Sequence, residues 1–185
     1  MQNDILIISE GGTYEFSGEA KDVQVLIRSV DNVIIILNDF DINNDKIMPF
    51  NIITNCTVSI QTKDGTQNCI ESKGIIEFTG EGSLYIKGYK GVKADKQVII
   101  NSSIQVVTEG DAIKADVINI AGGDLAISTE KDGLQGDYIN IEAGSVKITG
   151  TSGSSRGMYA KENISVSGGS ITINTTDDGI QSSSS

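Results

Sequence analysis

The sequence predicts an all-β protein that folds as a single-stranded, right-handed parallel β-helix with about 21–24 residues per coil. Three observations support this fold class. Many of the apolar residues are β-branched Ile and Val, which favour strands, and no helical periodicity is found. A short motif recurs at a nearly constant spacing. Between its copies, apolar and polar residues alternate in short segments separated by glycine-containing pairs.

The recurring motif consists of a small residue, an apolar residue, a long polar or aromatic residue and another small residue. Its apolar positions lie 22, 21, 21, 24 and 22 residues apart, at Ile70, Val92, Ile113, Leu134, Met158 and Ile180. The widest spacing reflects an insertion, GTSGSS, before Arg156. Because the repeat length is nearly constant, equivalent residues are expected to stack about 4.8 Å apart in neighbouring coils. The apolar positions then form one buried column.

Each repeat contains two further segments in which every second residue is apolar, as in half-buried strands. Ile118 with Ile120 represents the first segment, and Leu125 with Ile127 represents the second. The corners between the two segments are expected at Gly122-Gly123, Ala143-Gly144 and Gly168-Gly169. Three strands in about 22 residues correspond to one coil of a parallel β-helix. The main alternative is a β-sandwich, whose hairpins do not require columns in a fixed register.

The repeat predicts one β-helix domain over residues 1–185. Residues 1–48 are expected to form irregular N-terminal coils or a cap, 49–182 regular coils and 183–185 a tail. The last repeat, DDGIQSSSS, stops after its turn. An end of this kind exposes unpaired strand edges, which would allow oligomerisation through the coil ends.

The composition restricts the possible functions. The chain has no His, which excludes a Ser–His catalytic pair and a His-bound zinc site. Its formal net charge of −11 argues against nucleic acid and anionic membranes as partners and is compatible with Ca²⁺. No apolar run reaches membrane-spanning length, and the start MQNDILIISEGG lacks the features of a signal peptide. Cys56 and Cys69 are expected to be buried thiols, with a disulfide left open.

Three stretches carry a family resemblance: GGTYEFSG (11–18), GDAIKADVINIAGGDLAIST (110–129) and ISVSGGSITINTTDDGIQ (164–181). They resemble the bacterial carbohydrate-binding-domain β-helix proteins, which are related in fold to pectate and other polysaccharide lyases. The resemblance covers nearly the whole chain and is sharpest over residues 90–182. It implies an extracellular or cell-surface protein that holds Ca²⁺ between coils and binds acidic plant cell-wall polysaccharide, especially polygalacturonate. The family's Asp-Gly pair is replaced here by Asn68-Cys69, Lys90-Gly91 and Arg156-Gly157.

Aspartates in two columns are the candidate metal ligands. Asp111, Asp132 and Asp178 share one column, with Asp177 beside the last, and Asp95, Asp116 and Asp137 share the other. Stacked carboxylates repel one another, and a calcium ion with oxygen ligands from two coils would remove that penalty. The alternative is that each Asp begins a turn, accepts backbone N–H bonds and faces water.

Other residues near these columns are candidates for sugar contact. Tyr138, Tyr159, Lys93 and Lys114 are the predicted carbohydrate-binding residues. Tyrosine offers a pyranose ring a flat apolar face with a polar tip, although the chain has no Trp and few aromatic residues. The alternative for the tyrosines is that they cover the shoulder of the helix.

A lyase would require a lysine or arginine base close to a bound cation. Lys114, Lys161 and Arg156 are weak candidates, and the alternative for each is an ordinary solvated charge. The sequence therefore predicts calcium-assisted binding of an acidic, polygalacturonate-like polysaccharide. The alternative functions are a calcium-dependent uronate lyase and a passive structural or adhesive β-helix module.

Overall fold

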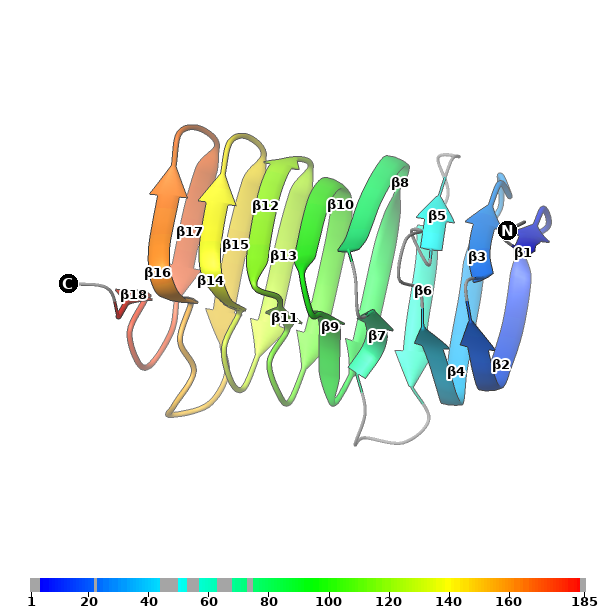
Figure 1. The fold of residues 1–185 in the computed structure, drawn as a ribbon, viewed down its shortest axis with the longest axis horizontal. Helices are drawn as coiled ribbons and strands as arrows, with labels where there is room; N and C mark the ends of the chain where they lie inside the picture. Colours follow the sequence, from blue (N-terminus) through cyan, green and yellow to red (C-terminus); the bar gives the residue numbers. More distant parts are fainter. Residues whose placement is uncertain are drawn as a thin grey trace.

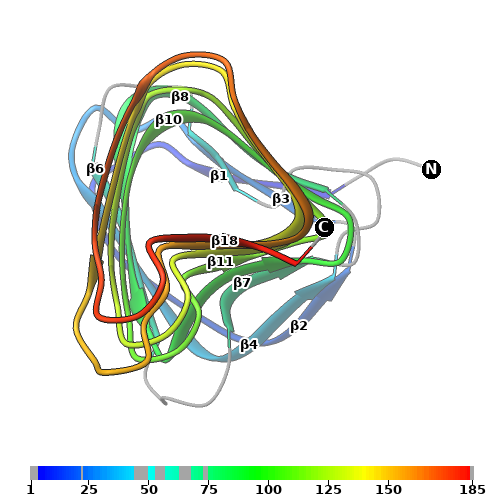
Figure 2. The same cartoon turned by 90° about the vertical axis from the view of Figure 1, so that its left-hand side faces the viewer.

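The structure is a computed structural model that describes residues 4–21, 23–43, 50–52, 57–62, 68–72 and 75–183. The described residues form strands and no helix, wound into a β-solenoid of about 7 turns. Neighbouring coils pair in parallel, so the strands lie across the long axis of the molecule (Figure 1). Viewed from the C-terminal end, the chain winds counterclockwise as it approaches the viewer, so the solenoid is right-handed (Figure 2). The predicted fold class is confirmed.

Three ladders of parallel strands form the walls of the solenoid. The first contains β7 (Asn68–Ser72), β9 (Lys90–Ala94), β11 (Ile113–Lys114), β18 (Ile180–Ser182) and the beginnings of β14 (Leu134–Ile141) and β16 (Met158–Val166). The second contains the beginnings of β8 (Ile75–Gly88) and β10 (Gln97–Thr108), all of β12 (Val117–Gly122) and the ends of β14 and β16. The third contains β6 (Thr57–Thr62), the ends of β8 and β10, and β13 (Asp124–Thr129), β15 (Ser145–Gly150) and β17 (Ser170–Asn174).

Parallel pairing also extends through the N-terminal region, for which the sequence predicted irregular coils. There β1 (Asp4–Ile8), β3 (Val23–Ile27) and β5 (Phe50–Ile52) form a separate three-stranded sheet. Beside it, β2 (Gly12–Lys21) pairs with β4 (Val33–Asn43), which continues into the third ladder through β6. The first described strand, β1, begins at Asp4.

The predicted apolar column is present in the first ladder. Strand pairing places Ile70 beside Val92, and continues through Ile113, Leu134, Met158 and Ile180. The first five of these residues are buried in the core, whereas Ile180 is 55% exposed because no later described coil covers it. The prediction for the two cysteines falls on residue 56 and on the side chain of residue 69, both outside the part of the chain that is described.

The predicted glycine corners depend on backbone conformation and on close stacking. Gly123, Gly144 and Gly169 have φ angles of +78°, +87° and +83°, a region that L-residues with a side chain rarely adopt. A Cβ atom at Gly123 would overlap the carbonyl group of Ser102 in the preceding coil. Glycine therefore allows consecutive corners to stack at the spacing of paired strands.

Candidate functional site

A groove of about 400 Å³ lies along the first ladder, parallel to the solenoid axis. We call it the axial groove. Its first wall consists of the residues that directly follow the apolar column, its floor of the next residues, and its second wall of the residues after those. These three rows are Lys93, Lys114, Gln135 and Tyr159; Ala94, Ala115 and Gly136; and Asp95, Asp116, Asp137 and Lys161.

The floor of the groove consists of small residues because the coils stack closely at these positions. Ala94 and Ala115 are buried, and a Cβ atom at Gly136 would lie 2.8 Å from the carbonyl oxygen of Ala115. The side chains on either side point outward because residues alternate along a strand. The alternation of small and long residues in the sequence motif therefore produces a hollow with polar walls.

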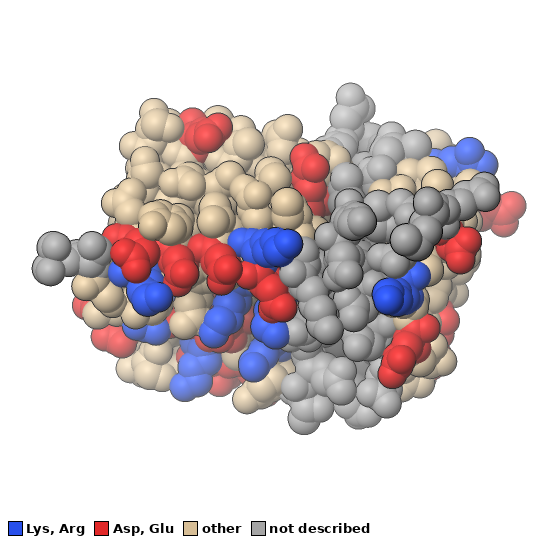
Figure 3. All heavy atoms as spheres, viewed as in Figure 1, with Lys and Arg blue, Asp and Glu red and all other residues tan. Residues whose placement is uncertain are grey.

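The charges on the two walls change along the axial groove. At one end, Lys93 lies across the floor from Asp95, with 3.8 Å between Nζ and Oδ1. Lys114 and Asp116 occupy the equivalent positions in the next coil, and at the other end Tyr159 lies opposite Lys161. Figure 3 shows a row of acidic side chains along this face of the molecule with basic side chains beside it. The groove thus offers paired charges at one end and an aromatic ring with a cation at the other.

Gln135 stands between the charged and the aromatic ends of the axial groove. Strand pairing places it beside Lys114 in one neighbouring coil and Tyr159 in the other. Its Oε1 atom is buried and has no hydrogen-bond partner among the described residues. Rotation of the amide toward the groove therefore breaks no hydrogen bond accepted by this oxygen. After such a rotation, the oxygen could accept a hydrogen bond from a hydroxyl group of a ligand.

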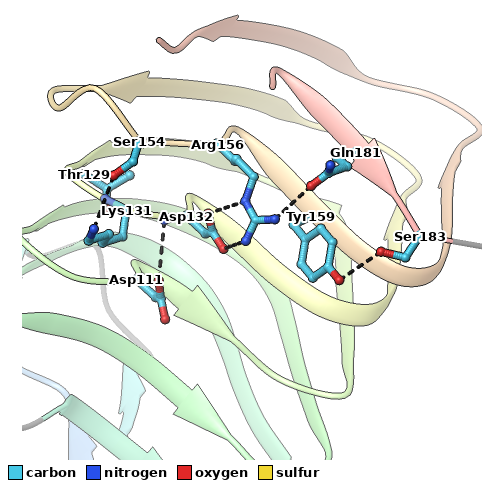
Figure 4. Close-up of polar contacts among 9 residues, drawn as sticks. All are labelled: Asp111, Thr129, Lys131, Asp132, Ser154, Arg156, Tyr159, Gln181 and Ser183. Atoms are coloured by element: carbon cyan, nitrogen blue, oxygen red, sulfur yellow. Dashed lines mark hydrogen bonds and ion pairs between the residues drawn. The ribbon is translucent and has the colours of Figure 1, made fainter. Parts of the chain in front are cut away.

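A second set of polar contacts adjoins the aromatic end of the groove, and we call it the Arg156 cluster (Figure 4). The guanidinium of Arg156 donates to Asp132 through Nε to Oδ1 at 2.8 Å and Nη2 to Oδ2 at 2.6 Å. Nη1 donates to Oε1 of Gln181 at 2.8 Å. The Cζ atom lies 4.1 Å from the centroid of the Tyr159 ring, whose hydroxyl is 2.9 Å from Ser183 Oγ.

The Arg156 cluster is partly enclosed by protein. The Asp132 side chain is 8% exposed and that of Arg156 is 25% exposed. The hydrogen bonds to Asp132 raise the pKa of Arg156 above its ordinary value, although desolvation acts in the opposite direction. A general base needs a lowered pKa, so this shift works against the candidate role of Arg156 in a lyase reaction.

Seven of the residues singled out in the sequence lie together in the axial groove: Lys93, Lys114, Tyr159, Lys161, Asp95, Asp116 and Asp137. Tyr138 directly follows Asp137 but lies outside the groove, and the residue is 46% exposed. Asp177 and Asp178 are exposed in the turn before β18. The sequence thus identified most of the groove walls but not the extent of the groove.

Asp111 and Asp132, which the sequence predicted to stack as calcium ligands, have other partners in the structure. The carboxylate of Asp111 accepts a 3.5 Å hydrogen bond from the backbone N–H of Asp132. Both carboxylate oxygens of Asp132 bind Arg156, so they do not form a free pair of calcium ligands with Asp111. Among the described residues, no three or more His, Cys, Asp or Glu side chains lie close enough together to hold a metal ion. A calcium ion would therefore need ligands from elsewhere.

The sequence interpretation missed the pairing of Arg156 with Asp132 and the position of Gln181. One signal was present: Arg156 occupies the column in which three other coils carry Asp111, Asp132 and Asp178. Backbone hydrogen bonds confirm this register, because Gly133 N binds Arg156 O at 3.0 Å and Gly157 N binds Asp178 O at 3.0 Å. A cation within a stacked column of acids indicates an ion pair between coils.

The fold and the groove define a parallel β-solenoid with an elongated polar binding surface. The profile of the family described as "Carbohydrate-binding domain-containing protein" matches residues 2–185, and the chain belongs to this family. This confirms the resemblance found in the sequence. Family membership indicates that the chain binds carbohydrate.

A solved structure supports the fold. The gadolinium derivative of the polysaccharide lyase-like protein from C. thermocellum has a TM-score of 0.61 and 19% sequence identity, over 100% of this chain and 87% of that chain. At this level of identity the likeness concerns the fold alone. No curated protein matches this chain in sequence. No helix among the described residues is long and apolar enough to cross a membrane.

Proposed function

We propose that the axial groove binds an acidic polysaccharide of the polygalacturonate type. The observation that carries this proposal is the presence of Tyr159 and Lys161 on opposite walls at one end of the groove. A tyrosine ring offers a face to a pyranose, and a lysine ammonium binds a carboxylate through charge-assisted hydrogen bonds. Lys93 and Lys114 supply further cations along the same groove.

The direction of the groove suits an extended chain of sugars. Its walls repeat once per coil, at the spacing of about 4.8 Å between paired strands. This spacing is close to the length of one sugar residue in an extended polysaccharide. A bound chain that runs parallel to the solenoid axis would therefore place successive sugars beside Lys93, Lys114, Gln135 and Tyr159 in turn.

We also propose that Ca²⁺ assists this binding. The chain carries a net charge of −11, and one wall of the groove contains Asp95, Asp116 and Asp137, so an anionic polymer would meet repulsion there. Calcium takes six to eight oxygen ligands, more than this wall supplies. Uronate carboxylates of the ligand would complete the coordination. We further propose that the protein acts outside the cell, because that is where it would meet a cell-wall polysaccharide.

The test is a binding titration with polygalacturonate oligomers, in calcium and after chelation. The wild-type protein is expected to bind in calcium and to lose at least tenfold in affinity with chelator. Lys161→Ala should weaken binding, whereas Lys147→Ala, an exposed lysine outside the groove, should not. Absence of binding in both conditions would overturn the proposal.

The same incubation tests the second function. Lys114 and Lys161 line the groove, where a lysine base of a uronate lyase would have to lie. Lyase cleavage leaves an unsaturated sugar that absorbs ultraviolet light. Steady growth of that absorbance, abolished by Lys114→Ala or Lys161→Ala, would assign the groove to catalysis. Binding without product supports a binding protein.

A further inference from the structure

The Tyr159 side chain is held from two directions. The guanidinium of Arg156 covers one face of its ring, with 4.1 Å between Cζ and the ring centroid. At the tip of the side chain, the hydroxyl lies 2.9 Å from Ser183 Oγ. One ring face is thus occupied by protein, and a pyranose has access only to the other.

Arg156 is itself fixed by residues from the two adjacent coils. Asp132 in the preceding coil accepts hydrogen bonds from Nε and Nη2, and Gln181 in the following coil accepts one from Nη1. All three nitrogen atoms of the guanidinium therefore have protein partners. Arg156 is also absent from the lining of the axial groove, whereas Tyr159 is part of it. Any effect of Arg156 on a ligand in the groove must pass through the tyrosine.

We propose that Arg156 is a positioning residue, which presets the orientation of Tyr159 for stacking against a sugar. The inference rests on the proposed function, because it assigns Arg156 a part in the same site. An ordered ring spares the ligand the entropy cost of fixing that side chain on binding, a gain equivalent to about 2- to 10-fold in affinity. The alternative is that Arg156 only stabilises the fold by pairing with Asp132.

Arg156→Lys tests this proposal, because lysine keeps the positive charge but lacks the planar group that stacks on the ring and forms two parallel hydrogen bonds. The variant is expected to bind polygalacturonate oligomers about 2- to 10-fold more weakly in calcium, at a temperature where it remains folded. Arg28→Lys is the matched control, since it makes the same substitution at an exposed arginine outside the groove.

A double-mutant cycle separates positioning from a general effect on the fold. In a Tyr159→Ala background, Arg156→Lys should cause no further loss of affinity, because the residue through which it acts is gone. An equal loss in both backgrounds, or unchanged affinity of Arg156→Lys alone, would overturn the inference. If Arg156→Lys does not fold, Gln181→Ala removes one hydrogen bond to the guanidinium and should give a smaller loss with the same dependence on Tyr159.

The two proposals fail in different ways. If Tyr159→Ala binds as well as the wild type, the proposed function at this end of the groove is wrong. If Tyr159→Ala loses affinity but Arg156→Lys and Gln181→Ala do not, the groove assignment stands and only the positioning role of Arg156 is wrong.

Discussion

Arg156 and Asp132 form an ion pair with two parallel hydrogen bonds between neighbouring coils, with nitrogen–oxygen distances of 2.8 and 2.6 Å. Asp132→Asn removes the negative charge and one of the two acceptor oxygens, so Arg156, whose side chain is 25% exposed, loses its charged partner. We expect the free energy of unfolding to fall by about 2–3 kcal/mol, below the cost of breaking a fully buried pair. Urea denaturation measures this change.

Asp124→Asn is the control for that variant, because the residue is exposed at a corner, and its effect should stay within about 0.5 kcal/mol.

The pH dependence of the free energy of unfolding gives a second check. Since the folded-state pKa of Arg156 is raised, the stabilisation from its charged form is fully present at neutral pH and is lost only as the pH rises through that raised pKa. The difference between wild type and Asp132→Asn should therefore be equal at pH 7 and pH 9, and a marked decrease at pH 9 would contradict this account.

The coil architecture could be predicted because it depends on a local pattern that repeats. Val92, Ile113 and Leu134 lie 21 residues apart, each with a small residue before it and another two positions after it, and the structure stacks them as that spacing requires. One sequence period fixes both the length of a coil and the register between coils. The glycine corners follow for the same reason, since a positive φ angle leaves few other choices of residue.

The partners of polar side chains could not be predicted in the same way. Asp132 and Asp111 occupy equivalent sequence positions, but Asp132 is buried and pairs with Arg156, which enters the column after the insertion GTSGSS. Which of several neighbours a carboxylate binds depends on side-chain reach and local burial, and the repeat constrains neither. Gln135 illustrates the same limit, because its unpartnered buried oxygen is apparent only in three dimensions.

Three glycines in different surroundings, Gly18, Gly123 and Gly153, allow backbone strain to be separated from steric overlap. Gly18 has a φ angle of +86° and no atom within 4 Å of the position that a Cβ atom would take, so Gly18→Ala should cost only the strain, about 1–2 kcal/mol. Gly123 combines a φ of +78° with overlap of the Ser102 carbonyl, so Gly123→Ala should cost about 3 kcal/mol or more. Gly153 has neither feature and Gly153→Ala should be nearly neutral. Thermal unfolding of the three variants measures this order, and equal losses at Gly18 and Gly123 would show that coil stacking is not what requires glycine.

A buried hydroxyl connects two neighbouring coils at Thr129. Its side chain is fully buried, donates to the carbonyl oxygen of Gly110 at 2.7 Å and accepts from the backbone N–H of Lys131 at 3.2 Å. The hydroxyl of Thr108 also donates to it, at 3.1 Å. Thr129→Val keeps the shape but leaves these groups unpaired, so we expect a loss of about 1–3 kcal/mol in the free energy of unfolding.

Two variants control for that substitution. Thr129→Ser retains the hydroxyl and should recover most of the stability lost in Thr129→Val. Thr108→Val removes the partner that makes only one of these hydrogen bonds, so its effect should be smaller. If Thr129→Ser and Thr129→Val unfold at the same urea concentration, the hydroxyl is not the group that stabilises this position.

The two tyrosines predicted to contact sugar differ in their surroundings, and this difference leads to unequal expected effects. Tyr159 lines the axial groove opposite Lys161, whereas Tyr138 is 46% exposed and lies outside the groove. Tyr159→Ala removes the ring against which a pyranose would stack, so affinity for polygalacturonate oligomers should fall by about 5- to 30-fold, or about 1–2 kcal/mol. Tyr138→Ala should change affinity by less than about twofold, because the loss of an exposed ring outside the groove leaves the groove walls intact.

Titration calorimetry of both variants in calcium measures the two effects. Tyr159→Phe serves as a control variant, because it keeps the ring and loses only the contact with Ser183. A larger loss for Tyr138→Ala than for Tyr159→Ala would place the sugar on the neighbouring outer surface, beyond the Asp137 wall, and would move the binding site out of the axial groove.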